Sequence, residues 1–252
     1  MSFSEFVEYN QSVLVYCMGI AKSIHMPGIA GVITNGINKK IIKRAISNGA
    51  DLLELRVDTF KDLRVETLKK ELKKLKSFSG LCDIPIILTV RSKREGGRVR
   101  INDATRVGIF EALLPLVDVI DIELSSKSIL QDVVNSARRQ GKKVIISYHN
   151  FRSTPGDKAL KKIIKKGLES GGHIIKIAAY AKEQGDLKRL AVILSDFKNL
   201  AVIAMGRRGA PSRVFFPMIG SLLTYGSITG KTAPGQLPIA VIKKEFKLYG
   251  FC

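Results

Sequence analysis

Short apolar runs alternate with longer amphipathic, lysine-bearing segments from about residue 28 onward. The short runs are rich in β-branched residues, which is typical of buried strands, whereas the longer segments have the apolar spacing of helices. The predicted strands cover residues 29–34, 51–57, 84–91, 117–124, 143–149, 173–179, 201–205 and 223–228. The predicted helices cover residues 39–48, 65–76, 104–114, 129–140, 157–170, 185–197, 212–220 and 237–247. Repeated strand–helix units with short connections predict a parallel sheet.

Eight such units in about 220 residues predict an α/β fold of the closed (β/α)8 (TIM barrel) type. An open doubly wound sheet is the alternative, but that fold usually has fewer strands. No Pro/Ser/Gly-rich linker and no low-complexity segment divides the chain, so we expect one barrel domain over residues 1–252. Residues 1–27 precede the first unit, and we expect them to form a short extension that closes the bottom of the barrel.

Polar residues in these strands follow the two-residue period by which side chains alternate between the barrel interior and the helices. In the second strand, Leu53 and Leu55 share one face, and Glu54 and Arg56 share the other. The same sorting recurs in the next four strands, where the polar or ionisable members are Thr89, Arg91, Asp121, Glu123, Ser147, His149 and Lys176. Catalytic residues of such barrels lie at the C-terminal ends of the strands. The pattern therefore predicts an active site at that mouth.

Lys176 stands in the middle of the apolar stretch GGHIIKIAAY, residues 171–180. A lysine at a strand end commonly extends its apolar stem and keeps its ammonium group in water. Burial would instead lower the pKa of the amine, and a partly neutral amine can attack a carbonyl to form a Schiff base. The sorting of polar residues in the neighbouring strands favours the catalytic interpretation.

The chain carries 42 Lys and Arg against 22 Asp and Glu, a net charge of +20. Such a charge is compatible with nucleic acid, an anionic membrane surface or an acidic small substrate. The lysines cluster at helical spacing within residues 69–76 and 161–166, which favours solvated helix faces. Aromatic residues make up only 7%, which gives little support to stacking on single-stranded nucleic acid.

Cysteine and histidine usage indicates a reducing compartment and no metal site. Cys17, Cys82 and Cys252 are odd in number and widely spaced, which argues against a disulfide framework. The three histidines form no HxH or HExxH motif. The first ten residues contain no basic residue, and the apolar run 13–20 is too short to span a bilayer. We therefore expect a cytoplasmic protein that does not bind membranes.

Seven motifs occur in order along the chain: ELRVD (54–58), TVRSKREGGR (89–98), DIEL (121–124), SYHNF (147–151), IKIA (175–178), MGRRGAPSR (205–213) and TAPGQ (232–236). Together they resemble the motifs of the type I 3-dehydroquinate dehydratases. The resemblance implies a (β/α)8 barrel that removes water from 3-dehydroquinate to give 3-dehydroshikimate. This reaction is the third step of the shikimate pathway, which leads to chorismate and the aromatic amino acids. The resemblance also implies a lyase with no cofactor and no metal.

The resemblance assigns roles to individual residues. Lys176 matches the lysine that forms the imine, His149 matches the residue that moves protons, and Glu95 matches the carboxylate that orients the histidine. The residues that match substrate-binding positions are Glu54, Arg56, Arg91, Met205, Arg213, Thr232 and Gln236. Arg213, Thr232 and Gln236 would hold the substrate carboxylate; the family often has serine where Thr232 stands. We expect Asp121 and Glu123 to act as partners of Arg56, Arg91 or Lys176.

Two other interpretations of the sequence stay open, and a third is rejected. Another Schiff-base barrel, of aldolase type, would share Lys176 but would not need the TAPGQ segment. A basic nucleic-acid-binding protein would use the surface lysines and leave Lys176 unexplained. The segment GSITGKT (226–232) has only three residues between its glycines, so it does not fit a phosphate-binding P-loop. We therefore expect a small-molecule substrate, no nucleic-acid partner and a possible homodimer.

Overall fold

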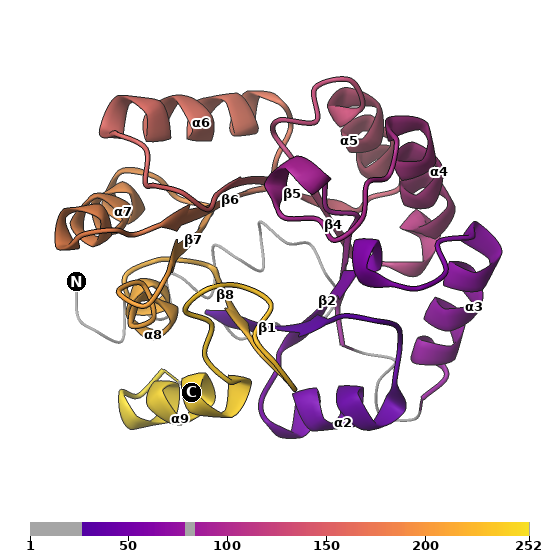
Figure 1. Ribbon diagram of the computed structural model, residues 1–252, viewed down its shortest axis with the longest axis horizontal. Helices are drawn as coiled ribbons and strands as arrows, with labels where there is room; N and C mark the ends of the chain where they lie inside the picture. The colour runs from indigo at the N-terminus through magenta and orange to yellow at the C-terminus, as the bar shows by residue number, and fades with distance from the viewer. Residues whose placement is uncertain (1–26, 79–83, 252) are drawn as a thin grey trace.

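The computed structural model describes residues 27–78 and 84–251, in which eight parallel strands are enclosed by eight α-helices (Figure 1). The strands are β1 (Gly28–Ile33), β2 (Leu52–Arg56), β3 (Ile86–Thr89), β4 (Val119–Glu123), β5 (Lys143–Asn150), β6 (Ile174–Tyr180), β7 (Leu200–Met205) and β8 (Leu223–Gly226). The helices are α2 (Lys39–Ser47), α3 (Val65–Lys76), α4 (Asp103–Leu113), α5 (Leu130–Arg139), α6 (Asp157–Glu169), α7 (Gln184–Asp196), α8 (Ser212–Met218) and α9 (Ile239–Leu248). The extension expected before residue 27 and the three cysteines lie outside the described residues.

The strands are hydrogen-bonded in the order β7-β6-β5-β4-β3-β2-β1-β8. No ladder joins β7 to β8 among the described residues, yet two hydrogen bonds connect their N-terminal ends. The Leu222 amide donates to the Leu200 carbonyl at 2.8 Å, and the Val202 amide donates to the Ser221 hydroxyl at 2.9 Å. These bonds leave the barrel nearly closed at one seam. The prediction of a (β/α)8 barrel is confirmed.

The two-residue period of the strands separates two apolar layers. Leu53, Leu55 and Leu88 belong to the large core between the sheet and the helices. A smaller cluster fills the barrel interior and contains Ala30, Val32, Leu52, Ile87, Val119, Ile145, Ile174, Ala201, Leu223 and Tyr225. The same period keeps polar side chains on the interior face nearer the C-terminal ends, where Thr89 is in register with Asp121 and Ser147 with Lys176. All four are buried, so the polar layer lies inside the protein.

Several element boundaries differ from the predicted ranges for local reasons. The third strand is shorter than 84–91, because β3 ends at Thr89 before the turn that leads to a short 3-10 helix, Lys93–Glu95. The last strand stops at Gly226, since the Ser227 amide and carbonyl bond to Leu237 and Ile239 instead of to β1. Helix α8 ends at Met218 and contains Pro217, which cannot donate a backbone hydrogen bond. These differences leave the strand–helix order unchanged.

No helix in residues 27–78 and 84–251 is both long and apolar enough to cross a membrane.

The seam between β7 and β8 provides a test of the fold. Ser221→Ala should lower the free energy of unfolding by about 1–3 kcal/mol, because the buried Val202 amide would lose its acceptor. Urea denaturation followed by circular dichroism would measure this loss. Ser47→Ala is the matched control, since the Ser47 hydroxyl is exposed and bonds only within its own helix. That variant should stay within about 0.5 kcal/mol of the parent; equal stability of the two variants would contradict the role of Ser221.

Candidate active site

All ten site residues predicted from the sequence line one pocket at the C-terminal mouth of the barrel. They are Glu54, Arg56, Arg91, Glu95, His149, Lys176, Met205, Arg213, Thr232 and Gln236. They reach the pocket from strands β2, β5, β6 and β7, from helix α8 and from two connections, those that follow β3 and β8. The remaining lining residues are Val32, Gly96, Phe151, Ala178, Ile203, Tyr225 and Ala233. The mixed polar and apolar lining suits a small polar molecule.

Lys176 projects from the middle of β6 into the pocket, and its side chain is 5% exposed. Its ammonium nitrogen lies 3.0 Å from Asp121 Oδ2 and 3.4 Å from Glu54 Oε1. Burial acts to lower the pKa of Lys176, but the carboxylates of Asp121 and Glu54 outweigh burial and raise it. The expectation of a partly neutral amine is therefore wrong for the unliganded site. The sequence identified the burial but did not show that two anions adjoin the amine.

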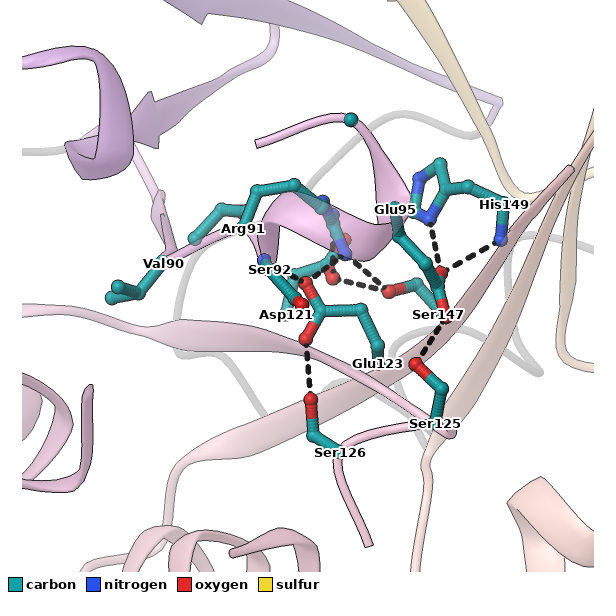
Figure 2. Close-up of polar contacts among 12 residues, drawn as sticks. Val90, Arg91, Ser92, Glu95, Asp121, Glu123, Ser125, Ser126, Ser147 and His149 are labelled. Carbon is teal, nitrogen blue, oxygen red and sulfur yellow. Dashed lines mark hydrogen bonds and ion pairs between the residues drawn. The ribbon is translucent and has the colours of Figure 1, made fainter. Parts of the chain in front are cut away.

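Arg91 belongs to a buried network of charges beside the pocket (Figure 2). Its partner Asp121 also accepts a hydrogen bond from Lys176. The Arg91 guanidinium donates to Asp121 Oδ1 at 2.8 Å, to Glu123 Oε1 at 2.9 Å and to Ser147 Oγ at 2.7 Å. Burial would raise the pKa of Asp121, but the charges of Arg91 and Lys176 lower it, so the carboxylate stays ionised. Charges of alternating sign thus compensate one another inside the barrel.

Arg56 lies outside this network. It forms a two-pronged ion pair with Asp58, in which Nε and Nη2 donate at 2.8 and 2.9 Å. Asp58 also accepts from the backbone amides of Arg91 and Arg98. Asp121 and Glu123 therefore contact Arg91, and Asp121 also contacts Lys176, but neither is the partner of Arg56.

Glu95 and His149 form a second polar unit in the pocket. One carboxylate oxygen, Oε2, lies 2.9 Å from the His149 amide nitrogen and 3.0 Å from Nδ1 of the ring (Figure 2). The other oxygen accepts a hydrogen bond from Ser125. Burial raises the pKa of Glu95 to about 7, while burial and the charges of Arg91 and Lys176 lower the pKa of His149. An ionised Glu95 therefore selects the neutral tautomer with hydrogen on Nδ1, which leaves Nε2 as a base.

The loop after Glu95 packs closely on His149. Gly96 adopts φ +88°, and a Cβ at this position would lie 2.7 Å from Cζ of Phe151. The Phe151 ring in turn stacks on the imidazole with a centroid separation of 6.4 Å. Only glycine fits this turn. The backbone at residue 96 therefore helps to hold the histidine through the aromatic ring.

Arg213, on helix α8, is a buried cation with no carboxylate partner among the described residues. Its guanidinium makes only long contacts of 3.5 Å to the carbonyls of Tyr225 and Pro234, and its Nε has no hydrogen-bond partner there. Burial lowers the pKa of Arg213 to about 10, so the group remains charged near neutral pH. An uncompensated buried charge is costly. This side of the pocket therefore suits an anionic group of a ligand.

Thr232 and Gln236 lie beside Arg213 in the loop that follows β8. The amide and hydroxyl of Thr232 contact Gln236 Oε1 at 2.6 and 3.0 Å. Gly235 has φ +72°, and a Cβ there would lie 2.2 Å from the Gly206 carbonyl oxygen. The close approach fixes this loop against the end of β7.

Several residues of the site were not predicted from the sequence. Tyr225 lines the pocket, and the period that was applied to the earlier strands would have placed it on the interior face of β8. Arg106 is buried on α4 and bonds Glu123, but a helical arginine carries no such signal. Ser125 bonds Glu95 from a loop that has no strand period. Among residues 27–78 and 84–251, no group of three or more His, Cys, Asp or Glu side chains could hold a metal ion.

Comparison with known proteins gives a consistent result. A family model described as type I 3-dehydroquinase matches residues 34–250. The 3-dehydroquinate dehydratase of Aquifex aeolicus is 41% identical over 209 residues, which cover 81% of this chain and 92% of that protein. The 3-dehydroquinate dehydratase of Methanosarcina barkeri is 36% identical over 219 residues, covering 83% of this chain and 89% of that protein.

Solved structures agree with the sequence relatives. The crystal structure of the Aquifex aeolicus enzyme has a TM-score of 0.79 at 37% identity and covers 88% of this chain and 98% of that one. The type I enzyme of Clostridium difficile has a TM-score of 0.80 at 30% identity and covers 89% and 92%. The family match, the identities and the shared barrel lead to one conclusion: this chain belongs to the type I 3-dehydroquinases, the hydro-lyases that dehydrate 3-dehydroquinate in the shikimate pathway.

Proposed function

We propose that this enzyme removes water from 3-dehydroquinate through an imine between the Lys176 amine and the substrate ketone. The observation that carries the proposal is the position of Lys176, buried in a pocket that also holds the Glu95–His149 pair and the uncompensated Arg213. The substrate is a cyclic β-hydroxyketone with a carboxylate. Each of these three groups of the protein therefore has a chemical counterpart on the substrate.

Arg213 is proposed to orient the substrate by its carboxylate. A guanidinium fork binds a carboxylate through two parallel hydrogen bonds, and this side chain lacks a carboxylate partner in the described part of the protein. Thr232 and Gln236 line the same side of the pocket and add polar contacts. Glu54, Arg56, Arg91 and Met205 line the other walls, where we expect the ring and its hydroxyl groups. The carboxylate site is the feature that distinguishes the proposed dehydratase from an aldolase-type Schiff-base enzyme.

Lys176 must lose a proton before it can attack. Asp121 and Glu54 are its nearest anions, and either carboxylate can accept that proton as the substrate enters. The amine then adds to the ketone carbon, and the ketone oxygen takes one proton from the amine and one from that carboxylate and leaves as water. The product is a protonated imine, which draws electrons from the adjacent carbon and acidifies its C–H bond. The two carboxylates that raise the pKa of the amine also stabilise the positive charge of the imine.

His149 is proposed to carry out the proton transfers of the elimination. Its neutral ring takes the proton from the carbon next to the imine, and the released electron pair forms an enamine. The imidazolium then donates that proton to the departing hydroxyl, which leaves as water and restores the neutral base. Glu95 stabilises the imidazolium between the two transfers, as a carboxylate does in hydrolase triads. Hydrolysis of the conjugated imine releases the product and the Lys176 amine.

A solved relative is known in a covalently modified form. The Clostridium difficile structure is described as containing covalently modified comenic acid. The same proposal includes a cytoplasmic enzyme that needs no cofactor and no metal. The absence of a nucleic-acid partner and the formation of a homodimer both stay predictions. Analytical ultracentrifugation and duplex binding at low salt would test them.

Borohydride trapping tests the imine directly. Reduction in the presence of substrate should inactivate the enzyme and add the mass of the reduced ligand to Lys176 in peptide mapping. Lys176→Met should abolish this labelling, whereas Lys165→Met, on the exposed face of α6, should leave it intact. Labelling of a different lysine, or no substrate-dependent labelling, would refute the imine mechanism.

Loss of the carboxylate site should appear in binding. Arg213→Ala should weaken substrate binding by roughly 2–5 kcal/mol, because a buried charge-assisted contact loses one partner. Isothermal titration would measure the loss, and Arg208→Ala, at an exposed position of the same segment, is the control. The methyl ester of the substrate should show most of the same loss with the unaltered enzyme. Equal binding of ester and acid would exclude Arg213 as the carboxylate site.

The Glu95–His149 pair predicts a dependence of kcat on pH. Because burial raises the pKa of Glu95 to about 7, protonation below that pH removes the anion that orients His149, and kcat should fall as the pH decreases through 7. Glu95→Gln should abolish this acid limb. His149→Ala should lower kcat by about 10²- to 10⁴-fold yet still yield the reduced adduct on Lys176. An unchanged acid limb in Glu95→Gln would assign the titration to another group.

A further inference from the structure

Two buried side-chain polar atoms have no hydrogen-bond partner of normal geometry in the part of the chain that the structure describes. They are Arg213 Nε and the Tyr225 hydroxyl oxygen, and both residues line the active-site pocket. Buried polar atoms in proteins are nearly always hydrogen-bonded, so each exception calls for a reason. The proposed carboxylate contact explains Arg213. The mechanism described so far makes no use of Tyr225.

Tyr225 is placed beside the reacting amine. It is the third residue of β8, is in register with Ala30 of β1, and is 4% exposed. The Lys176 ammonium nitrogen lies over its ring, 3.9 Å from the centroid. The face of an aromatic ring attracts a cation. The ring and the hydroxyl of Tyr225 are rigidly connected. A ligand atom bonded to Lys176 must therefore enter the space beside the Tyr225 side chain.

The Tyr225 hydroxyl is protonated, so it can donate a hydrogen bond. Burial raises the pKa of Tyr225, and the nearby Lys176 ammonium offsets only part of that effect. The group therefore keeps its proton near neutral pH. A carbon joined to Lys176 would lie about 1.5 Å from the nitrogen, so the reacting carbon would lie in the part of the pocket that Tyr225 borders.

We propose that the Tyr225 hydroxyl donates a hydrogen bond to the substrate ketone oxygen as Lys176 attacks, and that the ring then stabilises the cationic imine. This inference rests on the imine mechanism proposed above. The nitrogen lone pair forms the C–N bond, and the C=O π electrons move to the oxygen, where negative charge develops. That oxygen gains two protons, one from the amine after the attack and one from the carboxylate, Asp121 or Glu54, that first took the Lys176 proton, and it leaves as water. Tyr225 keeps its own proton and acts only by hydrogen bonding.

Tyr225→Phe removes the hydroxyl and keeps the ring, so it tests the donor alone. The rate of imine formation, measured in a single turnover by rapid mixing and borohydride quenching, should fall by about 10²-fold, as for loss of one donor to a developing oxyanion. The same variant should raise the melting temperature of the unliganded enzyme by about 2–4 °C, because an unsatisfied buried group is lost. A slower yet more stable enzyme is the combination expected of a functional hydroxyl.

Two further variants complete the test. Tyr249→Phe removes an exposed hydroxyl, so it should change neither the rate nor the melting temperature. Tyr225→Leu removes the ring as well, so the fraction of enzyme trapped as reduced imine at equilibrium should fall below that of Tyr225→Phe.

Three results would overturn the proposal. Imine formation in Tyr225→Phe within twofold of the parent rate would show that the hydroxyl is not used. A loss confined to substrate affinity, with an unchanged rate at saturation, would place the hydroxyl on a different part of the ligand. If the parent enzyme is labelled on Lys176 and Tyr225→Phe forms the imine at the parent rate, only the role of Tyr225 is rejected. If the parent enzyme is not labelled on Lys176, both the imine mechanism and the role of Tyr225 are rejected.

Discussion

The ion pairs that surround Lys176 inside the barrel are the constraint on which the rest of the site depends. A buried ammonium group is tolerated only when anions compensate it, and Asp121 and Glu54 do so at 3.0 and 3.4 Å. Asp121 in turn requires Arg91, and Arg91 requires Glu123. Glu123 finally pairs with Arg106 on helix α4. Each charge is thus held in place by the next, and removal of one would leave its neighbour unpaired.

The two walls of the pocket differ in how completely their polar groups are satisfied. On the wall formed by β2 to β6, the carboxylates and cations pair with one another before any ligand arrives. On the wall formed by α8 and β8, Arg213 and Tyr225 each retain a buried atom without a partner among the described residues. The first wall is organised for proton and amine chemistry. The second wall keeps buried polar atoms that a bound ligand could satisfy, which is where the proposed contacts of Arg213 and Tyr225 would form.

Strand residues of this site could be predicted from the sequence, because a period of two residues decides which side chains enter a barrel. Glu54, Lys176 and His149 all follow that rule. The period fails once the strand ends: Asp58, two residues beyond β2, turns back to hold Arg56. Contacts that come from helices and loops, such as those of Arg106 and Ser125, depend on tertiary packing and leave no pattern in the chain.

The sequence also predicted the wrong direction for the pKa of Lys176. An apolar surrounding in the sequence indicates desolvation, which lowers the pKa of an amine. The anions that reverse this effect come from β2 and β4, far away along the chain. Burial can be inferred from one strand, whereas the electrostatic balance at a residue requires its neighbours in the barrel.

The incomplete pairing between β7 and β8 has a mechanical consequence. Where neighbouring strands share no ladder, fewer bonds must break for them to separate, so the barrel is weakest along this line. Helix α8 spans the same line: the Ala204 amide of β7 donates to the Ser212 hydroxyl, and the Thr224 hydroxyl of β8 donates to the Arg213 carbonyl. A ligand carboxylate held by the Arg213 guanidinium would therefore be attached to the helix that joins the two strands where their own pairing is incomplete.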